Sequence, residues 1–457
     1  MLKAADALRA TGGRTIGTLP GEIRVSIDSR RIAPGETFLA LRGERFDGHD
    51  FIGEAFGRGA AAAVIADPAR LPEGASALIV PDTKAALLAL AAAARRRSVA
   101  RIVGITGSTG KTTTKTLVAQ LLARAFSGRV IATPANENNE IGVAKLLLSL
   151  DDEVALAVVE MGARHPGDIA LLTEMALPSV GVITNIGNAH LEIMGSYERL
   201  IEAKFAIFTR GAQPVLNALD AASRERARSF IESAGVFWFA ALTGRGSIPE
   251  VDGSLVALDG SSQMIVRANG REDRFEIEPA LPGKHNLHNL AAALAAALRL
   301  GVEPAVLADH VRELELPAGR YQRVRIGEIE LIYDAYNASM DGMLATLDAF
   351  SSEAATRRIA VLGSMAELGA EAADMHERVG AAAARAGLDA LLVGGAFAHE
   401  LERGARKAGF APASLVRFDR NDDAVTWLRA HGRAGDIVLL KASRMYRLEE
   451  ILEGLRS

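Results

Sequence analysis

One glycine-rich segment constrains the fold more than any other feature of this chain. Residues 102–115 read IVGITGSTGKTTTK, in which an apolar run leads into glycines and then into Lys-Thr-Thr. A strand, a glycine-rich turn and a helix start together present backbone N–H groups and a helix dipole to phosphate. The strict pattern G-x-x-x-x-G-K-[ST] fails, because Ile105 stands where it requires glycine. We predict a phosphate-binding loop, with a glycine-rich turn and a surface lysine as the alternative.

The side chains of this loop suit a nucleoside triphosphate. Gly107 and Gly110 let the backbone curl so that its amides point inward. Lys111 can reach the β- and γ-phosphates, and the Thr112 hydroxyl can hold Mg²⁺. The predicted nucleotide contacts in this segment are Thr106, Gly107, Ser108, Thr109, Gly110, Lys111, Thr112 and Thr113.

Length and composition limit the remaining classes of protein. A chain of 457 residues predicts about three domains. The formal net charge of −4 argues against a general nucleic-acid binder, and the absence of cysteine leaves only oxygen and imidazole ligands for a metal. The most apolar run, Ala85–Ala94, is ten residues long, whereas a membrane span needs about 20. The N-terminus has no secretory signal, so we expect a soluble cytoplasmic protein.

Apolar runs alternate with helical stretches along most of the chain, which predicts an α/β fold with mostly parallel sheets. We place three α/β domains at residues 1–98, 99–315 and 316–457. Strands are predicted at 36–41, 61–66, 77–80, 101–105, 154–159, 180–184, 214–216, 329–333, 358–362, 390–393 and 437–440. Helices are predicted at 83–97, 112–125, 197–209 and 286–300, and the polar stretch 242–278 is expected to add antiparallel strands.

Three further residues follow the loop along the chain. Glu160 ends an apolar strand, where a carboxylate is placed to hold a metal beside the phosphates, with a solvated carboxylate at the strand end as the alternative. His190 follows the next strand, although imidazole is unusual beside Mg²⁺ and a lone histidine is more often structural. Nothing in the residue pattern alone distinguishes Lys204 from a solvated helix lysine.

Four motifs in order, TGSTGKTTT, VVEMGARHPGDI, TNIGNAHLE and EAK, resemble the Mur ligases, the ATP-dependent amide-forming enzymes of peptidoglycan synthesis. The resemblance implies that Glu160 and His190 bind Mg²⁺ and that Lys204 is a carbamylated lysine. A carbamate would make Lys204 an oxygen donor. The implied catalytic residues are Lys111, Glu160, His190 and Lys204, and the implied metal site is Thr112, Glu160, His190 and Lys204.

The segment 26–50 is similar to a uridine-nucleotide-binding N-terminal domain that several ligases of the family share. The segments 136–143, 334–343 and 361–369 are similar to the branch of this family that joins D-alanyl-D-alanine to UDP-N-acetylmuramoyl-tripeptide. The resemblance implies a small UDP-binding N-terminal domain, a central ATP-binding domain and a C-terminal Rossmann-like domain. Ser29 and Arg30 are the predicted donors to the pyrophosphate, since it favours hydroxyl and guanidinium groups; a turn with a surface arginine is the alternative. Asn138 and Asn139 are predicted to line the muropeptide path. The alternative is a purely conformational role, because asparagine tolerates left-handed turn geometry.

The C-terminal half supplies further expected nucleotide contacts. Asn286 and Asn289 lie one helical turn apart and can share a face. By resemblance, Asn289 contacts the adenine, Arg320 reaches the phosphates, and Asp334 and Asn337 contact the nucleotide. Helix caps, surface charges or turns are the alternatives for each. The sequence departs from the family wording at Ser339-Met340, Ser364 and 441–445, which puts details of the C-terminal contacts in doubt.

The resemblance implies a reaction through an acyl phosphate. The γ-phosphoryl group of ATP activates the peptide carboxylate, and the amine of D-alanyl-D-alanine then attacks the acyl carbon. Domain closure would exclude water from this intermediate. The sister ligase that adds the third amino acid, another amide ligase of the superfamily and a non-catalytic nucleotide-binding module remain alternatives. A monomer is expected.

Overall fold

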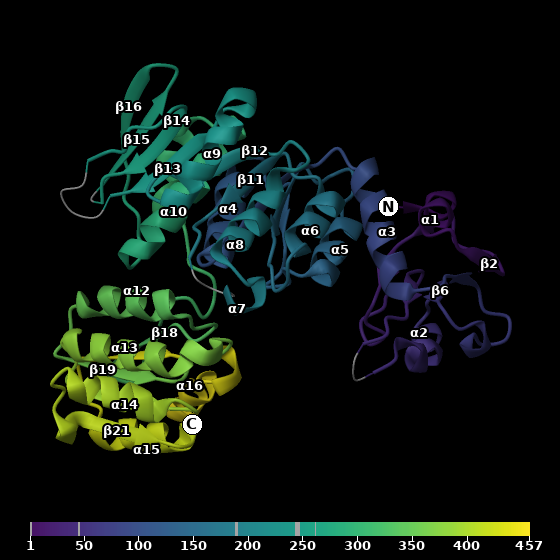
Figure 1. Ribbon diagram of the computed structural model, residues 1–457. Helices are drawn as coiled ribbons and strands as arrows, with labels where there is room; N and C mark the ends of the chain where they lie inside the picture. Colours follow the sequence, from purple (N-terminus) through teal and green to yellow (C-terminus); the bar gives the residue numbers. More distant parts are fainter. Residues whose placement is uncertain (1, 44–45, 188–190, 243–246, 261) are drawn as a thin grey trace. The chain divides into compact units, whose positions relative to one another are not determined.

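The structure is a computed structural model that describes residues 2–43, 46–187, 191–242, 247–260 and 262–457 (Figure 1). The chain separates into two compact units. One unit comprises residues 1–106, 122–182 and 202–214, and the other comprises residues 107–121, 183–201 and 215–457. The fold is α/β, as predicted, with most of its strands in three sheets.

The N-terminal part of the chain (purple in Figure 1) contains a five-stranded sheet in the order β2-β7-β6-β5-β4. Strands β4 to β7 are parallel neighbours, and β2 is antiparallel to β7. The elements here are β1 (Leu2–Lys3), α1 (Ala4–Thr11), β2 (Arg14–Ile16), β3 (Glu22–Ile23), β4 (Val25–Ser26), β5 (Thr37–Leu39), α2 (Ile52–Gly57), β6 (Ala62–Ile65), β7 (Ala77–Ile79) and α3 (Thr83–Arg97). A buried cluster including Phe38, Ile52 and Ile65 forms their core.

A nine-stranded sheet follows, in the order β16-β15-β14-β13-β12-β11-β8-β10-β9. Its strands are β8 (Arg101–Thr106), β9 (Val130–Ala132), β10 (Leu156–Glu160), β11 (Val180–Ile183), β12 (Gln213–Asn217), β13 (Phe237–Ala241), β14 (Ser254–Leu258), β15 (Gln263–Ala268) and β16 (Arg271–Glu276). Strand β10 is parallel to both β8 and β9, whereas β14, β15 and β16 are successive antiparallel neighbours. The antiparallel strands expected within 242–278 are therefore present, although β14 itself runs parallel to β13.

The helices between these strands are α4 (Lys111–Ala125), α5 (Glu140–Leu148), α6 (Asp168–Ala176), α7 (Leu191–Met194), α8 (Tyr197–Phe205), α9 (Ala221–Ala234), α10 (Lys284–Arg299) and α11 (Pro304–His310). Helix α10 is alanine-rich, and its residues 289–297 are buried. Its small side chains allow it to pack closely against β13 and β14.

The C-terminal part of the chain (green to yellow in Figure 1) has a six-stranded sheet in the order β17-β18-β22-β19-β20-β21. Its elements are β17 (Gln322–Ile326), β18 (Ile329–Tyr333), α12 (Met340–Ser351), β19 (Arg357–Leu362), α13 (Ala372–Arg385), β20 (Ala390–Gly394), α14 (Ala398–Lys407), β21 (Leu415–Phe418), α15 (Asn421–His431), β22 (Asp436–Lys441) and α16 (Glu449–Arg456). All pairs are parallel except β17 with β18.

Two hydrophobic clusters cover the two faces of this sheet. Ile332 and Leu439 belong to the cluster that includes α12, α13 and α14, whereas Leu331 and Val438 belong to the cluster that includes α15 and α16. Neighbouring strand residues point to opposite faces, so a continuous apolar strand requires a helical layer on each side. This is the three-layer α/β/α arrangement of a doubly wound fold.

The predicted elements agree with the structure at most positions. The helix at 83–97 and the strand at 329–333 have the predicted bounds. The helix predicted at 197–209 is shorter, because α8 ends at Phe205 and a 3₁₀ turn covers 206–208. The strands that were missed are β1 to β4, β9, β13, β17 and β21. Among the described residues no helix is long and apolar enough to cross a membrane.

Candidate functional site

The predicted phosphate-binding loop lies between a buried strand and a helix. Strand β8 ends at Thr106 and α4 begins at Lys111, so residues 107–110 form the turn. Gly110 has φ +79°, and a Cβ atom there would overlap the side-chain oxygen of Asn289. At Gly107 a Cβ would overlap the Thr184 hydroxyl. Glycine is therefore required at both positions by close neighbours as well as by backbone conformation.

The Lys111 ammonium group lies over the carbonyl edge of this turn. Its Nζ donates to Gly107 O at 2.9 Å and to Ser108 O at 3.2 Å. Thr112 is partly buried in the first turn of α4, and Thr113 is buried. A 15-residue helix with a lysine at its N-terminus and a glycine turn before it has the features that anion binding requires.

Asn289 lies beside the turn, as its predicted nucleotide contact requires, but it also has structural partners. Asn289 Oδ1 accepts from Thr114 Oγ1 at 3.4 Å, and its Nδ2 donates to Asn286 Oδ1 at 3.1 Å. Asn286 in turn donates to Pro282 O at 2.7 Å. The predicted shared helix face is confirmed by the hydrogen bond between the two asparagines.

Glu160 is the last residue of β10 and is 1% exposed. It is the partner of Ile105 in the parallel register with β8, so it lies at the carboxyl edge of the sheet. Its Oε1 accepts from Asn138 Nδ2 at 2.8 Å, and its N–H donates to Thr133 Oγ1 at 3.0 Å. Asn138 therefore orients Glu160. Asn139 is the N-cap of α5, where its Oδ1 accepts from Gly142 N–H at 3.0 Å.

The predicted metal ligands are only partly described. Lys204 lies on α8 and is 3% exposed, which is unusual for a lysine. His190 lies outside the described residues. No group of three or more histidine, aspartate or glutamate side chains that could hold a metal occurs within the described ranges. The buried carboxylate of Glu160 nevertheless has the hard oxygen chemistry that Mg²⁺ prefers.

Asp334 follows β18 and forms a buried ion pair with Lys441 at the end of β22. Lys441 Nζ is 2.7 Å from Asp334 Oδ2 and also donates to Asp334 O at 3.3 Å, while Thr346 Oγ1 donates to Oδ2 at 2.6 Å. Burial raises the pKa of Asp334, but the attraction and hydrogen bond of Lys441 outweigh it and leave that pKa below its ordinary value. Burial lowers the pKa of Lys441.

The other two predicted C-terminal contacts lie nearby in the same part of the chain. The Arg320 guanidinium is 4.8 Å from the centre of the Tyr336 ring, in a cation–π contact. Its buried Nε has no hydrogen-bond partner among the described residues. Asn337 is exposed, and its Oδ1 accepts from Ala338 N–H at 2.9 Å.

The two predicted pyrophosphate donors in the N-terminal part already contact carboxylates. Ser29 is 7% exposed, and its hydroxyl donates to Glu54 Oε2 at 3.0 Å. The exposed Arg30 forms a two-pronged pair with Asp28, and this hydrogen bonding lowers the pKa of Asp28 to about 2. An anionic ligand would have to compete with Asp28 for Arg30.

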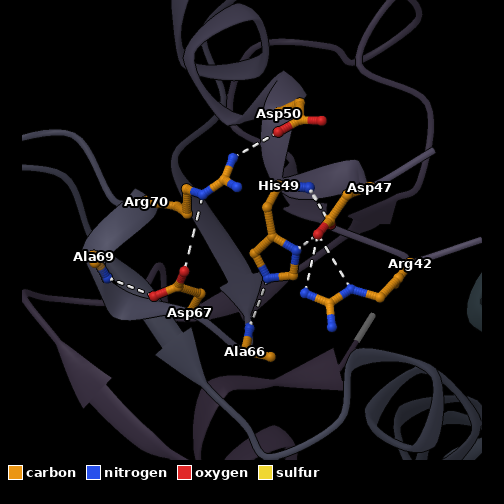
Figure 2. A network of polar contacts seen from close by, with 8 residues as sticks. All are labelled: Arg42, Asp47, His49, Asp50, Ala66, Asp67, Ala69 and Arg70. Carbon is orange, nitrogen blue, oxygen red and sulfur yellow. Dashed lines mark hydrogen bonds and ion pairs between the residues drawn. The ribbon is translucent and has the colours of Figure 1, made fainter.

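A network of polar side chains lies within residues 42–70 of the N-terminal part (Figure 2). His49 is 4% exposed; its Nε2 accepts from Ala66 N–H at 2.9 Å, and its Nδ1 is 2.6 Å from Asp47 Oδ1. Because Nε2 accepts, Nδ1 carries the proton and donates to Asp47. Arg42 also donates to Asp47, and the hydrogen bonds from His49 and Arg42 lower the pKa of Asp47. This histidine is a buried structural link.

The prediction missed several residues that shape the site. Thr184 and Asn185 contact the phosphate loop, Thr133 holds the backbone of Glu160, and Lys441 pairs with Asp334. Thr184 and Asn185 do lie within the motif TNIGNAHLE. Their position directly after a buried strand was the available signal.

The fold and this turn together define a nucleotide-binding α/β protein with a phosphate loop. Models of the Mur ligase family match residues 24–99 ("Mur ligase family, catalytic domain"), 105–297 ("Mur ligase middle domain") and 319–444 ("Mur ligase, glutamate ligase domain"). A UDP-N-acetylmuramoyl-tripeptide–D-alanyl-D-alanine ligase of Synechocystis sp. is 37% identical over 451 residues, which cover 96% of this chain and 94% of the relative.

Solved structures are similar as well. A crystal structure of MurF from Acinetobacter baumannii has a TM-score of 0.84 and 27% identity, and covers 100% of this chain and 98% of its own. MurF from Thermotoga maritima in complex with ADP has a TM-score of 0.76 and 28% identity, with 95% and 97% covered. The chain belongs to the Mur ligase family, and the predicted resemblance is confirmed.

Proposed function

We propose that this protein is the ATP-dependent ligase that joins D-alanyl-D-alanine to UDP-N-acetylmuramoyl-tripeptide, forming ADP and phosphate. The observation that carries the proposal is the 37% identity over 96% of the chain to a ligase with these substrates in its name. Two separate features of the structure support it: the glycine turn at residues 107–110 before α4, and the buried carboxylate of Glu160 at the end of β10.

The chemistry requires an activated carboxylate, because an oxide ion is a poor leaving group. Transfer of the γ-phosphoryl group from ATP to the tripeptide carboxylate gives an acyl phosphate and ADP. The amine of D-alanyl-D-alanine then attacks the acyl carbon, loses a proton, and expels phosphate as the amide forms. Phosphoryl transfer depends mainly on positioning and on neutralising charge, which Lys111 and the N-terminus of α4 are placed to supply.

The roles of the individual residues are part of this proposal. Mg²⁺ would neutralise phosphate charge when bound, and Thr112, Glu160, His190 and carbamylated Lys204 are its proposed ligands. The burial of Lys204 supports a role inside the site rather than that of a solvated helix lysine. The remaining proposed contacts are Thr106, Gly107, Ser108, Thr109, Gly110, Thr113, Asn289, Arg320, Asp334 and Asn337 for the nucleotide, and Ser29, Arg30, Asn138 and Asn139 for the muropeptide.

We further propose three domains with boundaries near residues 98 and 315, a monomer, and a cytoplasmic location. The separate five-stranded and six-stranded sheets support these boundaries, as do the family matches at 24–99, 105–297 and 319–444. Closure of the domains around ATP would protect the acyl phosphate from water. Small-angle scattering should report compaction with ATP and muropeptide, and an unchanged profile would refute closure.

The function is tested by phosphate release from ATP and Mg²⁺ by the purified chain. Release should require both UDP-N-acetylmuramoyl-tripeptide and D-alanyl-D-alanine, with the UDP-N-acetylmuramoyl-pentapeptide as product. Release that requires a UDP-N-acetylmuramoyl-dipeptide and a diamino acid would instead assign the sister ligase. ATP binding with no turnover on either substrate set would favour a non-catalytic nucleotide-binding protein.

A further inference from the structure

Two residues that directly follow β11, Thr184 and Asn185, bind the backbone of the phosphate loop. Ser108 N–H donates to Asn185 O at 3.0 Å, and Thr109 N–H donates to Asn185 Oδ1 at 2.9 Å. The Asn185 amide Nδ2 donates to Thr109 Oγ1 at 3.0 Å, and the Thr184 hydroxyl donates to Thr109 O at 2.6 Å. Three of these hydrogen bonds hold three consecutive peptide groups of the loop, from Gly107–Ser108 to Thr109–Gly110, and the fourth holds the Thr109 side chain.

The direction of these bonds determines the electrostatics of the loop. An anion site needs N–H groups that face the ligand and carbonyl groups that face away from it. Here the carbonyl of Thr109 accepts from the Thr184 hydroxyl, and the carbonyls of Gly107 and Ser108 accept from the Lys111 ammonium group. The N–H groups of Ser108 and Thr109 are taken by Asn185. In this arrangement the N-terminus of α4 faces the phosphate, and the nucleotide contacts proposed for Ser108 and Thr109 are not made by their backbone N–H groups.

The two residues are themselves held in place. Thr184 is 6% exposed, and its carbonyl accepts from Asn217 Nδ2 at 3.3 Å at the end of β12. The Thr184 hydroxyl occupies the space that a Cβ atom at Gly107 would need. The Thr184 hydroxyl can therefore occupy this position only because residue 107 is glycine. A rigid support of this kind preorganises a binding loop before the ligand arrives.

We propose that Thr184 and Asn185, together called the loop latch, are positioning residues that set the phosphate loop in its ATP-binding conformation. This inference rests on the proposed ATP site at residues 107–113. The latch does not contact the reacting atoms. It acts through the loop, by holding the Thr109 carbonyl away from the phosphates and by fixing the turn that precedes Lys111.

The test is the affinity for ATP with Mg²⁺, measured by titration calorimetry on the whole chain without muropeptide. Thr184→Val removes the hydroxyl and keeps the branched side chain, whereas Thr184→Ser keeps the hydroxyl and is its matched control. Asn185→Ala removes both side-chain hydrogen bonds to Thr109. Asn421→Ala is a control for general loss of stability, because Asn421 forms comparable bonds to Tyr446 O and Arg447 O in the C-terminal part.

We expect Asn185→Ala and Thr184→Val each to weaken ATP binding about tenfold or more, since a tenfold change corresponds to the loss of one to two hydrogen bonds. Thr184→Ser should stay within about threefold of the wild type. The rise in melting temperature that ATP produces should shrink in the two weakened variants and persist in Asn421→Ala, even where that control melts earlier.

Equal ATP affinity in the wild type and in Thr184→Val would overturn the latch, as would equal weakening by Thr184→Ser. If Asn185→Ala does not fold, the valine and serine pair still decides the question. A wild-type chain that binds no ATP would refute the proposed function itself, so the two failures are distinguishable.

Discussion

Replacing Lys441 with methionine should strongly destabilise the C-terminal sheet, because it leaves the Asp334 carboxylate buried without its counter-charge. The two side chains are 3% and 7% exposed, and their charged atoms are 2.7 Å apart. At an effective dielectric constant of about 20, their gross attraction is about 6 kcal/mol. Burying two charges offsets part of this, and breaking a buried pair typically costs about 3–5 kcal/mol.

The variant Asp334 carboxyl group can escape this cost by binding a proton. At pH 7, protonating a carboxyl of ordinary pKa costs about 4 kcal/mol, but at pH 5 it costs only about 1.5 kcal/mol. The free-energy difference between the wild type and Lys441→Met should therefore shrink by about 3 kcal/mol from pH 7 to pH 5. In the wild type the pKa of Asp334 is lowered, so its contribution to stability is present above the ordinary aspartate pKa and is lost only as pH falls through the lowered pKa.

Hydrogen exchange of the β18 and β22 amides measures this difference in the whole chain, since local opening free energies do not require two-state unfolding. Methionine keeps most of the lysine stem and removes only the charge. In a matched control, Asp334→Asn combined with Lys441→Met, the difference from the wild type should be nearly independent of pH over this range. The reasoning would be refuted if Lys441→Met lowered the opening free energy by less than about 1 kcal/mol, or by the same amount at pH 5 as at pH 7.

Three further perturbations test other parts of the molecule. Glu160→Gln keeps the side-chain oxygen acceptor and the length but removes the charge, so Mg²⁺-dependent phosphate release should fall about 100-fold or more while the melting temperature changes little; retained turnover would exclude Glu160 as a metal ligand. Gly110→Ala should abolish ATP binding in calorimetry. Its control is Gly12→Ala, which is also at positive φ but has nothing within 4 Å of the new Cβ, so it should reduce only stability. Equal ATP binding by both variants would contradict the steric argument. His49→Ala should leave the Ala66 N–H without its acceptor and destabilise the N-terminal part by about 1–3 kcal/mol; unchanged hydrogen exchange across β6 would contradict this.

The sequence by itself determined the fold class, the family and the position of the phosphate loop. These features are local: an apolar run before glycines, and a lysine at the start of a helix, fix a strand–turn–helix unit whatever surrounds it. Helix α3 has the predicted bounds, and three arginines lie in its last turn as expected from the helix dipole; the structure adds that Asp82 caps its first turn. Strand β13 was missed although its run FWFAA is as fully buried as the predicted strands β20 and β22.

Only the tertiary structure decided what most polar side chains contact. Asn138 was assigned to the muropeptide path, but its amide holds Glu160 from a segment 22 residues away along the chain. Asp334 and Lys441 are 107 residues apart and meet because β18 and β22 are neighbours in the sheet. Asn185 reaches the phosphate loop because β11 lies beside β8 in the strand order. Hydrogen-bond partners depend on which strand ends are neighbours in the sheet. A local pattern of residues does not contain that information, because the partners are far apart along the chain.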